Sequence, residues 1–325
     1  MPTMNDHHQH VELVAAALGR GAAEQRAALM AALTLPDAAE LLRALDAAGL
    51  LTRLLPALEP ARHTDQPHVH FLPVLGHSLE AVAAVDWLLG QIAGEATGVP
   101  PAAIRANPSL AYRSRYAAQL RAHFAELVSG YPRPALLRLG ALLHDVAKPQ
   151  TKRLLPDGSV NFHEHQSIGG EVAAAAAERL GFAPAEVAYV RMIVREHMRP
   201  GQLWALDQLT QRAVQRFFFA TDEAGPDVLL HLLADHMATR GPQLNVRSWI
   251  AQAQWIDTLL DTIWGEPAPE PVVLADGNDL MRELGLRPGP QIGRLLAAIG
   301  EAQADGEIAT RDEALALARR LLGQV

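Results

Sequence analysis

Histidine and acidic residues recur along the chain in positions suited to metal binding. The chain has 14 histidines and no cysteine, so a metal site would use imidazole and carboxylate ligands rather than thiolates. The most specific local signal is the adjacent pair His144 and Asp145, which follows the apolar segment PALLRLGALL and precedes Lys148. Pro149 is expected to stop this helix. Apolar packing at a helix end would make the pair two rigid ligands.

Further residues of the same types lie in or beside apolar helical segments. These are His77 in LGHSLEAV, His165 in HEHQSIGGE, His197 in REHMRP and Asp235 in LLADHMA. Each one alone is also compatible with an ordinary core histidine or an exposed acid. The ordered set is typical of ligands that point inward from several packed helices.

The elements that would position these residues are predicted to be helices. Apolar residues recur at spacings of three and four, as in LEAVAAVDWLLGQIA and DVLLHLLADHMATR, and alternating strand-like runs are essentially absent. Pro134, Pro184 and Pro226 fit first-turn positions, and Asp37 and Asp207 fit helix caps. The sequence therefore predicts an all-α protein.

Two stretches rich in proline and glycine, 93–110 and 265–273, lack helical period and are expected to be connections. We predict three parts: an N-terminal helical segment at 1–62, a large helical domain at 63–264 and a C-terminal helical tail at 265–325. We find no internal repeat.

The ordered ligand set resembles the HD-domain metal-dependent phosphohydrolase superfamily, an all-helical fold whose ligands follow the order His, His-Asp, Asp. Within it, HTDQPHVHFLPVLGHSLEAV, ALLHDVAKPQTK, FHEHQSIGGEVA and LLADHMATRG resemble the HD region of bacterial tRNA nucleotidyltransferases, the CCA-adding enzymes and their poly(A) polymerase relatives. The flanks resemble the neck and C-terminal tail of those enzymes. Neither a Gly-Gly-x-x-Arg-Asp motif nor a paired Asp-x-Asp is found. We therefore expect the chain alone not to polymerise nucleotides.

The resemblance implies a divalent metal centre with one or two ions. A mixed set of histidines and carboxylates suits Mn, Fe, Co, Ni or Zn better than Mg. Such a centre would activate a water for attack at phosphorus and polarise the phosphoryl oxygens. The implied ligands of the first ion are His77, His144, Asp145 and Asp235. A second ion, or the substrate phosphate when one ion is bound, would contact His165 and His197.

The same resemblance implies catalytic roles for Asp145 and Lys148. Asp145 would bind metal with one oxygen and orient the attacking water with the other. Lys148 would be a point charge for the substrate phosphate, with Arg153 further out.

Other histidines near the ligand set receive weaker predictions. His163 is two residues from His165, so both cannot face one point, and we prefer His165 as the ligand and keep His163 as a substrate contact. His68 and His70 lie just upstream of the first ligand and are expected to line the site entrance. Some others are expected to lie in a disordered tail (His7, His8, His10) or to pack behind the ligands (His231, His236).

The charge distribution leaves nucleic-acid binding open. The net charge of −8 argues against a largely basic surface that binds long nucleic acid. However, residues 105–153 carry a net charge of +7 and include both lysines of the chain. This stretch fits either a phosphate-facing surface for RNA or nucleotides or a solvated Arg-rich helix face in AYRSRYAAQLRAHF. No apolar run is long enough to span a membrane, so we expect a soluble, cytoplasmic protein with no membrane partner.

The predicted function is metal-dependent hydrolysis of a phosphoester of a nucleotide or RNA 3′ end, of the 2′,3′-cyclic phosphodiesterase, 2′-nucleotidase or phosphatase type. One alternative is an HD phosphohydrolase that acts on free nucleotides or deoxynucleotides. Another is a non-catalytic module that binds tRNA or serves as the partner in a split tRNA nucleotidyltransferase. The oligomeric state is left open.

Overall fold

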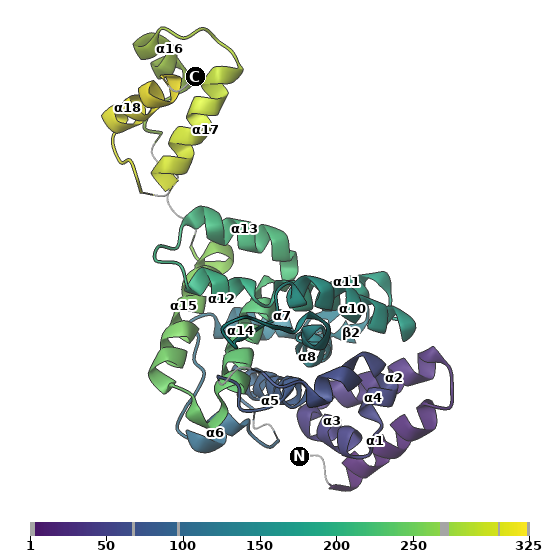
Figure 1. Cartoon of the computed structure of the whole chain (residues 1–325). Helices are drawn as coiled ribbons and strands as arrows, with labels where there is room; N and C mark the ends of the chain where they lie inside the picture. The colour runs from purple at the N-terminus through teal and green to yellow at the C-terminus, as the bar shows by residue number, and fades with distance from the viewer. Residues whose placement is uncertain (1–3, 67–68, 96–97, 267–272, 305, 324–325) are drawn as a thin grey trace. The chain divides into compact units, whose positions relative to one another are not determined.

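The computed structural model describes residues 4–66, 69–95, 98–266, 273–304 and 306–323. Within these ranges the protein is almost entirely helical (Figure 1). The strands form two small antiparallel pairs, β1 (Leu127–Val128) with β2 (Tyr131–Pro132) and β3 (Arg153–Leu154) with β4 (Val160–Asn161). The predicted all-α class, with helical segments on both sides of the HD region, is confirmed.

The chain divides into two compact units. The first is Met1–Ala205 with Thr221–Leu260, and the second is Leu206–Ala220 with Asp261–Val325. The predicted domain boundaries near 62 and 264 are not tested by this division and stay a prediction. In the described ranges, no helix has the length and apolar character needed to cross a lipid bilayer.

The first unit begins with a layer of short helices and continues into helices that surround one buried helix. The N-terminal layer consists of α1 (Met4–Ala17), α2 (Ala22–Thr34), α3 (Ala38–Ala47), α4 (Leu51–Leu54) and the 3₁₀ helix η1 (Pro56–His63). The following helices are α5 (Val74–Ala93), α6 (Ala102–Ala106), α7 (Ala117–Phe124), α8 (Arg133–Leu143), α9 (Lys148–Thr151), α10 (His165–Arg179), α11 (Pro184–Glu196), α12 (Arg199–Trp204), η2 (Asp222–Ala224), α14 (Gly225–Arg240), η3 (Gly241–Gln243) and α15 (Val246–Trp264).

Helix α5 is the centre of the first unit because it is apolar around almost its whole circumference. It packs against α3, α8 and α14. A buried ion pair fixes its contact with α8, where Arg138 Nε lies 2.6 Å from Asp86 Oδ1. The same two side chains reach the N-terminal layer, since Arg138 donates to the Leu33 carbonyl at 3.0 Å and Asp86 accepts from the Ala39 amide at 2.9 Å.

Glycines allow α8, α10 and α11 to approach closely. A Cβ at Gly140 on α8 would lie 2.7 Å from Ile193 on α11, and one at Gly169 on α10 would lie 3.2 Å from Val194. These contacts bring the C-terminal ends of α8 and α11 beside the first residue of α10. Three of the predicted ligands lie at these helix ends.

The second unit has its own small core. It contains α13 (Gln211–Thr221), α16 (Gly277–Leu284), α17 (Pro290–Ala304) and α18 (Arg311–Leu322). Leu280, Ile292, Ile299 and Leu315, one or two from each of the last three helices, are buried together. Capping boxes at Asp276 and Thr310 define where α16 and α18 begin.

The His-Asp pair lies at the end of its helix as predicted, but the prediction that Pro149 stops this helix is wrong. Helix α8 ends at Leu143, His144 is its C-cap, and Asp145 lies in the turn that follows. Pro149 instead occupies the first turn of α9, a position that its missing N–H tolerates. The early end of α8 is what lets two consecutive side chains enter the site.

Two further local predictions are also wrong. The first histidines are not a disordered tail, because His7, His8 and His10 belong to α1 and His7 Nε2 lies 2.8 Å from Asp37 Oδ2. Asp207 does not cap a helix. Thr210 does so for α13, since its hydroxyl accepts from the Ala213 amide at 3.2 Å.

Other local predictions hold in part. Pro134, Pro184 and Pro226 lie in the first turns of their helices, as predicted. Asp37 lies at the N-cap of α3, but its side chain makes no cap hydrogen bond. The segment AYRSRY precedes α7 instead of forming its Arg-rich face.

The close approach at Gly140 yields a test. We expect Gly140→Ala to lower the free energy of unfolding by about 1 to 3 kcal/mol, because the added methyl group would overpack Ile193. The measurement is denaturant unfolding. Gly293→Ala in α17 is the matched control, since a Cβ there meets nothing within 4 Å. Equal stability of the two variants would contradict the predicted overpacking.

Candidate metal centre

Six side chains predicted as ligands converge in the first unit from five separate segments. His77 lies in the first turn of α5, His144 and Asp145 at the end of α8, His165 at the start of α10, His197 at the end of α11 and Asp235 in α14. Segments as distant in sequence as α5 and α14 thus contribute to one place. The structure brings the whole predicted set together.

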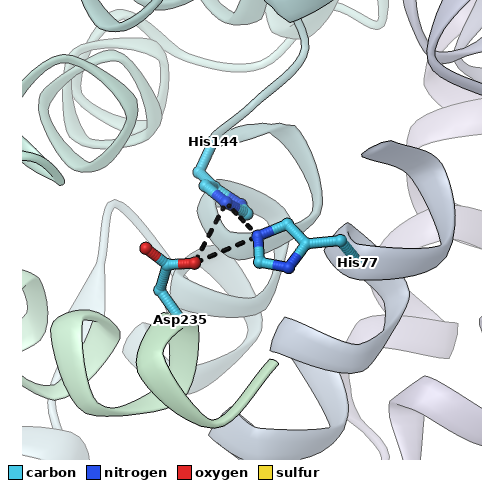
Figure 2. Close-up of side chains that lie close together, drawn as sticks. All are labelled: His77, His144 and Asp235. Carbon is cyan, nitrogen blue, oxygen red and sulfur yellow. Dashed lines mark hydrogen bonds and ion pairs between the residues drawn. The ribbon is translucent and has the colours of Figure 1, made fainter. Parts of the chain in front are cut away.

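The first cluster is formed by His77, His144 and Asp235, whose side chains point toward one another (Figure 2). The Nε2 atoms of the two histidines lie 3.1 Å apart. Asp235 Oδ1 lies 3.0 Å from His77 Nε2 and 3.7 Å from His144 Nε2. The histidines are fully buried, whereas the Asp235 side chain is 25% exposed.

The second cluster is formed by Asp145, His165 and His197. The Nε2 atoms of its histidines lie 3.2 Å apart, and they lie 3.4 Å and 3.9 Å from Asp145 Oδ1. The other oxygen, Asp145 Oδ2, lies 3.1 Å from His144 Nε2 in the first cluster. Asp145 therefore bridges the two clusters with one oxygen toward each.

Backbone carbonyl groups fix the orientation of three imidazoles. In each case Nδ1 lies within hydrogen-bonding distance of the carbonyl oxygen three residues earlier: His144 to Ala141 at 2.7 Å, His165 to Phe162 at 2.8 Å and His197 to Val194 at 2.7 Å. A carbonyl oxygen only accepts, so each Nδ1 must carry the proton. The Nε2 lone pair of each ring then points into the site, as metal ligation requires.

This orientation tests whether the residues fit a cation. His165 and His197 present two Nε2 lone pairs to each other at 3.2 Å, a contact that is repulsive unless something electron-poor lies between them. Burial lowers the pKa of both histidines, and the neighbouring His144 adds to the effect at His197. Both rings are therefore neutral, which is the state that binds metals. The donor set fits a divalent cation.

The carboxylates of the site are ionised. Burial opposes this, yet His144 and Lys148 together hold the pKa of Asp145 well below its usual value. Burial is likewise outweighed at Asp235, where the hydrogen bond and charge of His77 lower the pKa. At His144, burial lowers the pKa but the adjacent Asp145 carboxylate outweighs it, and the pKa is raised.

A pocket of about 420 Å³ adjoins the two clusters and contains several predicted substrate contacts. Lys148, His70 and His163 all line it. His163 is exposed whereas His165 is buried, which agrees with the preference for His165 inside the site. Arg153 is exposed on β3 and is not among the lining residues. His68 lies outside the described residues.

The structure also places residues in the site that sequence reasoning missed. Phe162, Met198 and Gln202 line the pocket, and Gln66 accepts a hydrogen bond from Lys148. His231, by contrast, packs behind the ligands as predicted: it lies one turn before Asp235, is fully buried with both ring nitrogens unpaired, and has its ring centroid 4.8 Å from that of His144. A histidine one turn before a predicted ligand was a signal for this packing, whereas no local pattern marked Gln66.

Comparison with known proteins agrees with this geometry. Residues 111–234 match the family model described as HD domain, and residues 273–318 match the one described as tRNA nucleotidyltransferase domain 2, putative. The chain is 33% identical to the CC-adding tRNA nucleotidyltransferase of Thermus thermophilus over 284 residues. This aligned region covers 86% of this chain and 52% of that protein.

A second relative gives the same result. The A-adding tRNA nucleotidyltransferase of Deinococcus radiodurans is 33% identical over 293 residues, covering 90% of this chain and 56% of that protein. The chain thus spans about half the length of either relative. The ordered ligands, the helical fold and these matches agree: residues 111–234 match the HD domain, and the chain resembles the HD and C-terminal regions of bacterial tRNA nucleotidyltransferases.

Proposed function

We propose that the chain is a metal-dependent phosphohydrolase that acts on a phosphoester of a nucleotide or RNA 3′ end. The expected activities are 2′,3′-cyclic phosphodiesterase, 2′-nucleotidase and phosphatase. The observation that carries the proposal is the pair of His-carboxylate clusters that share Asp145 beside a pocket containing Lys148. The names of the two relatives, both of which add nucleotides to tRNA, support a tRNA end as one candidate substrate.

The two clusters define how metal would be held. In our proposal His77, His144, Asp145 and Asp235 would hold a first ion, while Asp145, His165 and His197 would hold a second ion or face the substrate phosphate. Mn, Fe, Co, Ni and Zn suit these ligands better than Mg. A bound divalent ion would supply Lewis acidity toward a phosphoryl oxygen and would acidify water.

Residues of the chain would perform the remaining steps. Asp145 would orient the attacking water through the oxygen that it does not give to the first ion. Lys148 would place an ammonium charge against the phosphate. Burial lowers the pKa of His70 to about 4, so His70 would contribute neutral hydrogen bonding at the pocket. His163 would contact the substrate at the exposed rim, with Arg153 further out.

The proposal predicts metal-dependent hydrolysis. After the metal has been stripped, Mn, Ni, Co, Zn, Fe and Mg are added back separately, and turnover of 2′,3′-cyclic AMP, 2′-AMP, 3′-AMP and p-nitrophenyl phosphate is measured. We expect at least one transition metal to restore turnover. Asp145→Ala should lower it by about 100-fold or more, because the bridging carboxylate is lost.

Asp312→Ala, an exposed acid on α18, is the matched control and should keep full turnover on these small esters. If no ion restores turnover above that of the Asp145 variant, the phosphohydrolase proposal is wrong. The long match to the tRNA nucleotidyltransferases would then favour the alternative of a tRNA-binding or partner module. Preference for free nucleoside monophosphates or deoxynucleotides over RNA ends would identify the other alternative.

Metal stoichiometry tests the two clusters separately. His77→Ala and His165→Ala each remove one histidine from one cluster, and bound metal is counted by elemental analysis. If two ions bind, each variant should lose one. If a single ion binds at the first cluster, only His77→Ala should lose it. His63→Ala, which changes an exposed histidine at the end of η1, should keep the full complement.

The same experiment has a stability readout. Metal at 100 times its dissociation constant should stabilise the wild-type protein by about 2.7 kcal/mol, seen as a higher unfolding midpoint. The gain should be reduced in the affected variants. Unchanged metal content in both His77→Ala and His165→Ala would show that these clusters do not hold the ion.

A further inference from the structure

The ammonium group of Lys148 is held at the edge of the metal clusters by an ion pair and a hydrogen bond. Its Nζ lies 2.6 Å from Asp145 Oδ2 and donates to Gln66 Oε1 at 2.6 Å. The side chain is only 9% exposed, and Nζ lies 5.5 Å from the centre of the Phe162 ring. An ammonium has three N–H donors. The hydrogen bond to Gln66 uses one of these donors, so N–H donors remain for the pocket that Lys148 lines.

Gln66 connects Lys148 to the segment that leads into α5. While Oε1 accepts from Lys148, Nε2 donates to the Leu72 carbonyl at 3.3 Å. A hydrogen bond also joins the two ends of this segment, because the Val74 amide donates to the Thr64 carbonyl at 3.0 Å. A side-chain amide can donate and accept at once, so Gln66 links the lysine to the Leu72 carbonyl.

Both lysines of the chain contact this short segment. Lys152 Nζ donates to the Asp65 carbonyl at 3.1 Å, next to the contact between Lys148 and Gln66. Of the 28 lysines and arginines in the chain, the remaining 26 are arginines. A lysine provides a compact point charge on a flexible stem, and such a charge needs fixed acceptors to be held in one direction.

We propose that Gln66 is a positioning residue for Lys148, which it holds with one N–H directed into the pocket. The inference rests on the proposed function, in which that N–H contacts the substrate phosphate. Without Gln66, the remaining partner of the ammonium is Asp145 Oδ2, the oxygen that also lies 3.1 Å from His144 Nε2. The ammonium would then turn toward the carboxylate and away from the phosphate.

The test is the steady-state kinetics of Gln66→Leu, which removes both hydrogen bonds at nearly constant volume. With the preferred metal and p-nitrophenyl phosphate, we expect KM to rise by about 5- to 10-fold while kcat stays within about 3-fold, as for a lost binding interaction. The inhibition constant of inorganic phosphate should rise in parallel, and bound metal should not change. Gln91→Leu, an exposed glutamine on α5, is the control and should match the wild type.

A double-mutant cycle separates positioning from general damage. In a Lys148→Met background, Gln66→Leu should cause no further change in KM or in phosphate inhibition, because Gln66 acts through Lys148. Additive effects in the two backgrounds would overturn the proposal, as would a KM like that of the wild type in Gln66→Leu. Gln66→Met repeats the test if the leucine variant does not fold.

A failure of the proposed function would give other results than a failure of the positioning role. Wild-type protein that neither hydrolyses any ester with any metal nor binds inorganic phosphate would overturn the phosphohydrolase proposal, and with it the role assigned to Gln66. Wild-type protein that turns over an ester while Gln66→Leu behaves identically would overturn the positioning role alone.

Discussion

The candidate metal centre depends on carbonyl groups that aim its imidazole rings. The last carbonyls of a helix have no partner within the helix, and His144 and His197, the C-caps of α8 and α11, each direct Nδ1 at the carbonyl three residues earlier. One hydrogen bond from Nδ1 therefore gives a carbonyl at the helix end a partner and also fixes the direction of the Nε2 lone pair. The packing of the first unit brings these ends together.

Buried charge imposes a second constraint on the first unit. A buried carboxylate is costly unless it is paired, and Asp145 meets this need through histidines and Lys148. Asp227 on α14 meets it through His123 Nε2 at 2.6 Å, Arg133 Nη1 at 3.3 Å and the Tyr189 hydroxyl. These partners come from α7, α8 and α11, so the network fixes α14 against the helices that carry other ligands.

The chemical assignment follows from which groups are fixed and which remain available. Backbone carbonyls hold the Nδ1 atoms of His144, His165 and His197, and both carboxylates are ionised. Lys148, by contrast, lies at the pocket, paired with Asp145 and hydrogen-bonded to Gln66, and keeps N–H donors for a ligand. A rigid ligand set beside a charged pocket suits the binding of a phosphate group next to a metal ion, which is why hydrolysis of a phosphoester is the function that we propose.

The sequence by itself determined the helical fold class and the ligand candidates, because helical period and residue type are local properties. It assigned the wrong role to Pro149, predicted a helix cap at Asp207 and took the first histidines for a disordered tail. Each of these depends on contacts or turns that no local pattern encodes, such as the reach of His7 to Asp37 across 30 residues. Only the tertiary structure showed that Asp145 bridges two clusters and that Gln66 holds Lys148. Such contacts are decided when distant segments pack, since the free energy of burying and pairing charges depends on which groups meet.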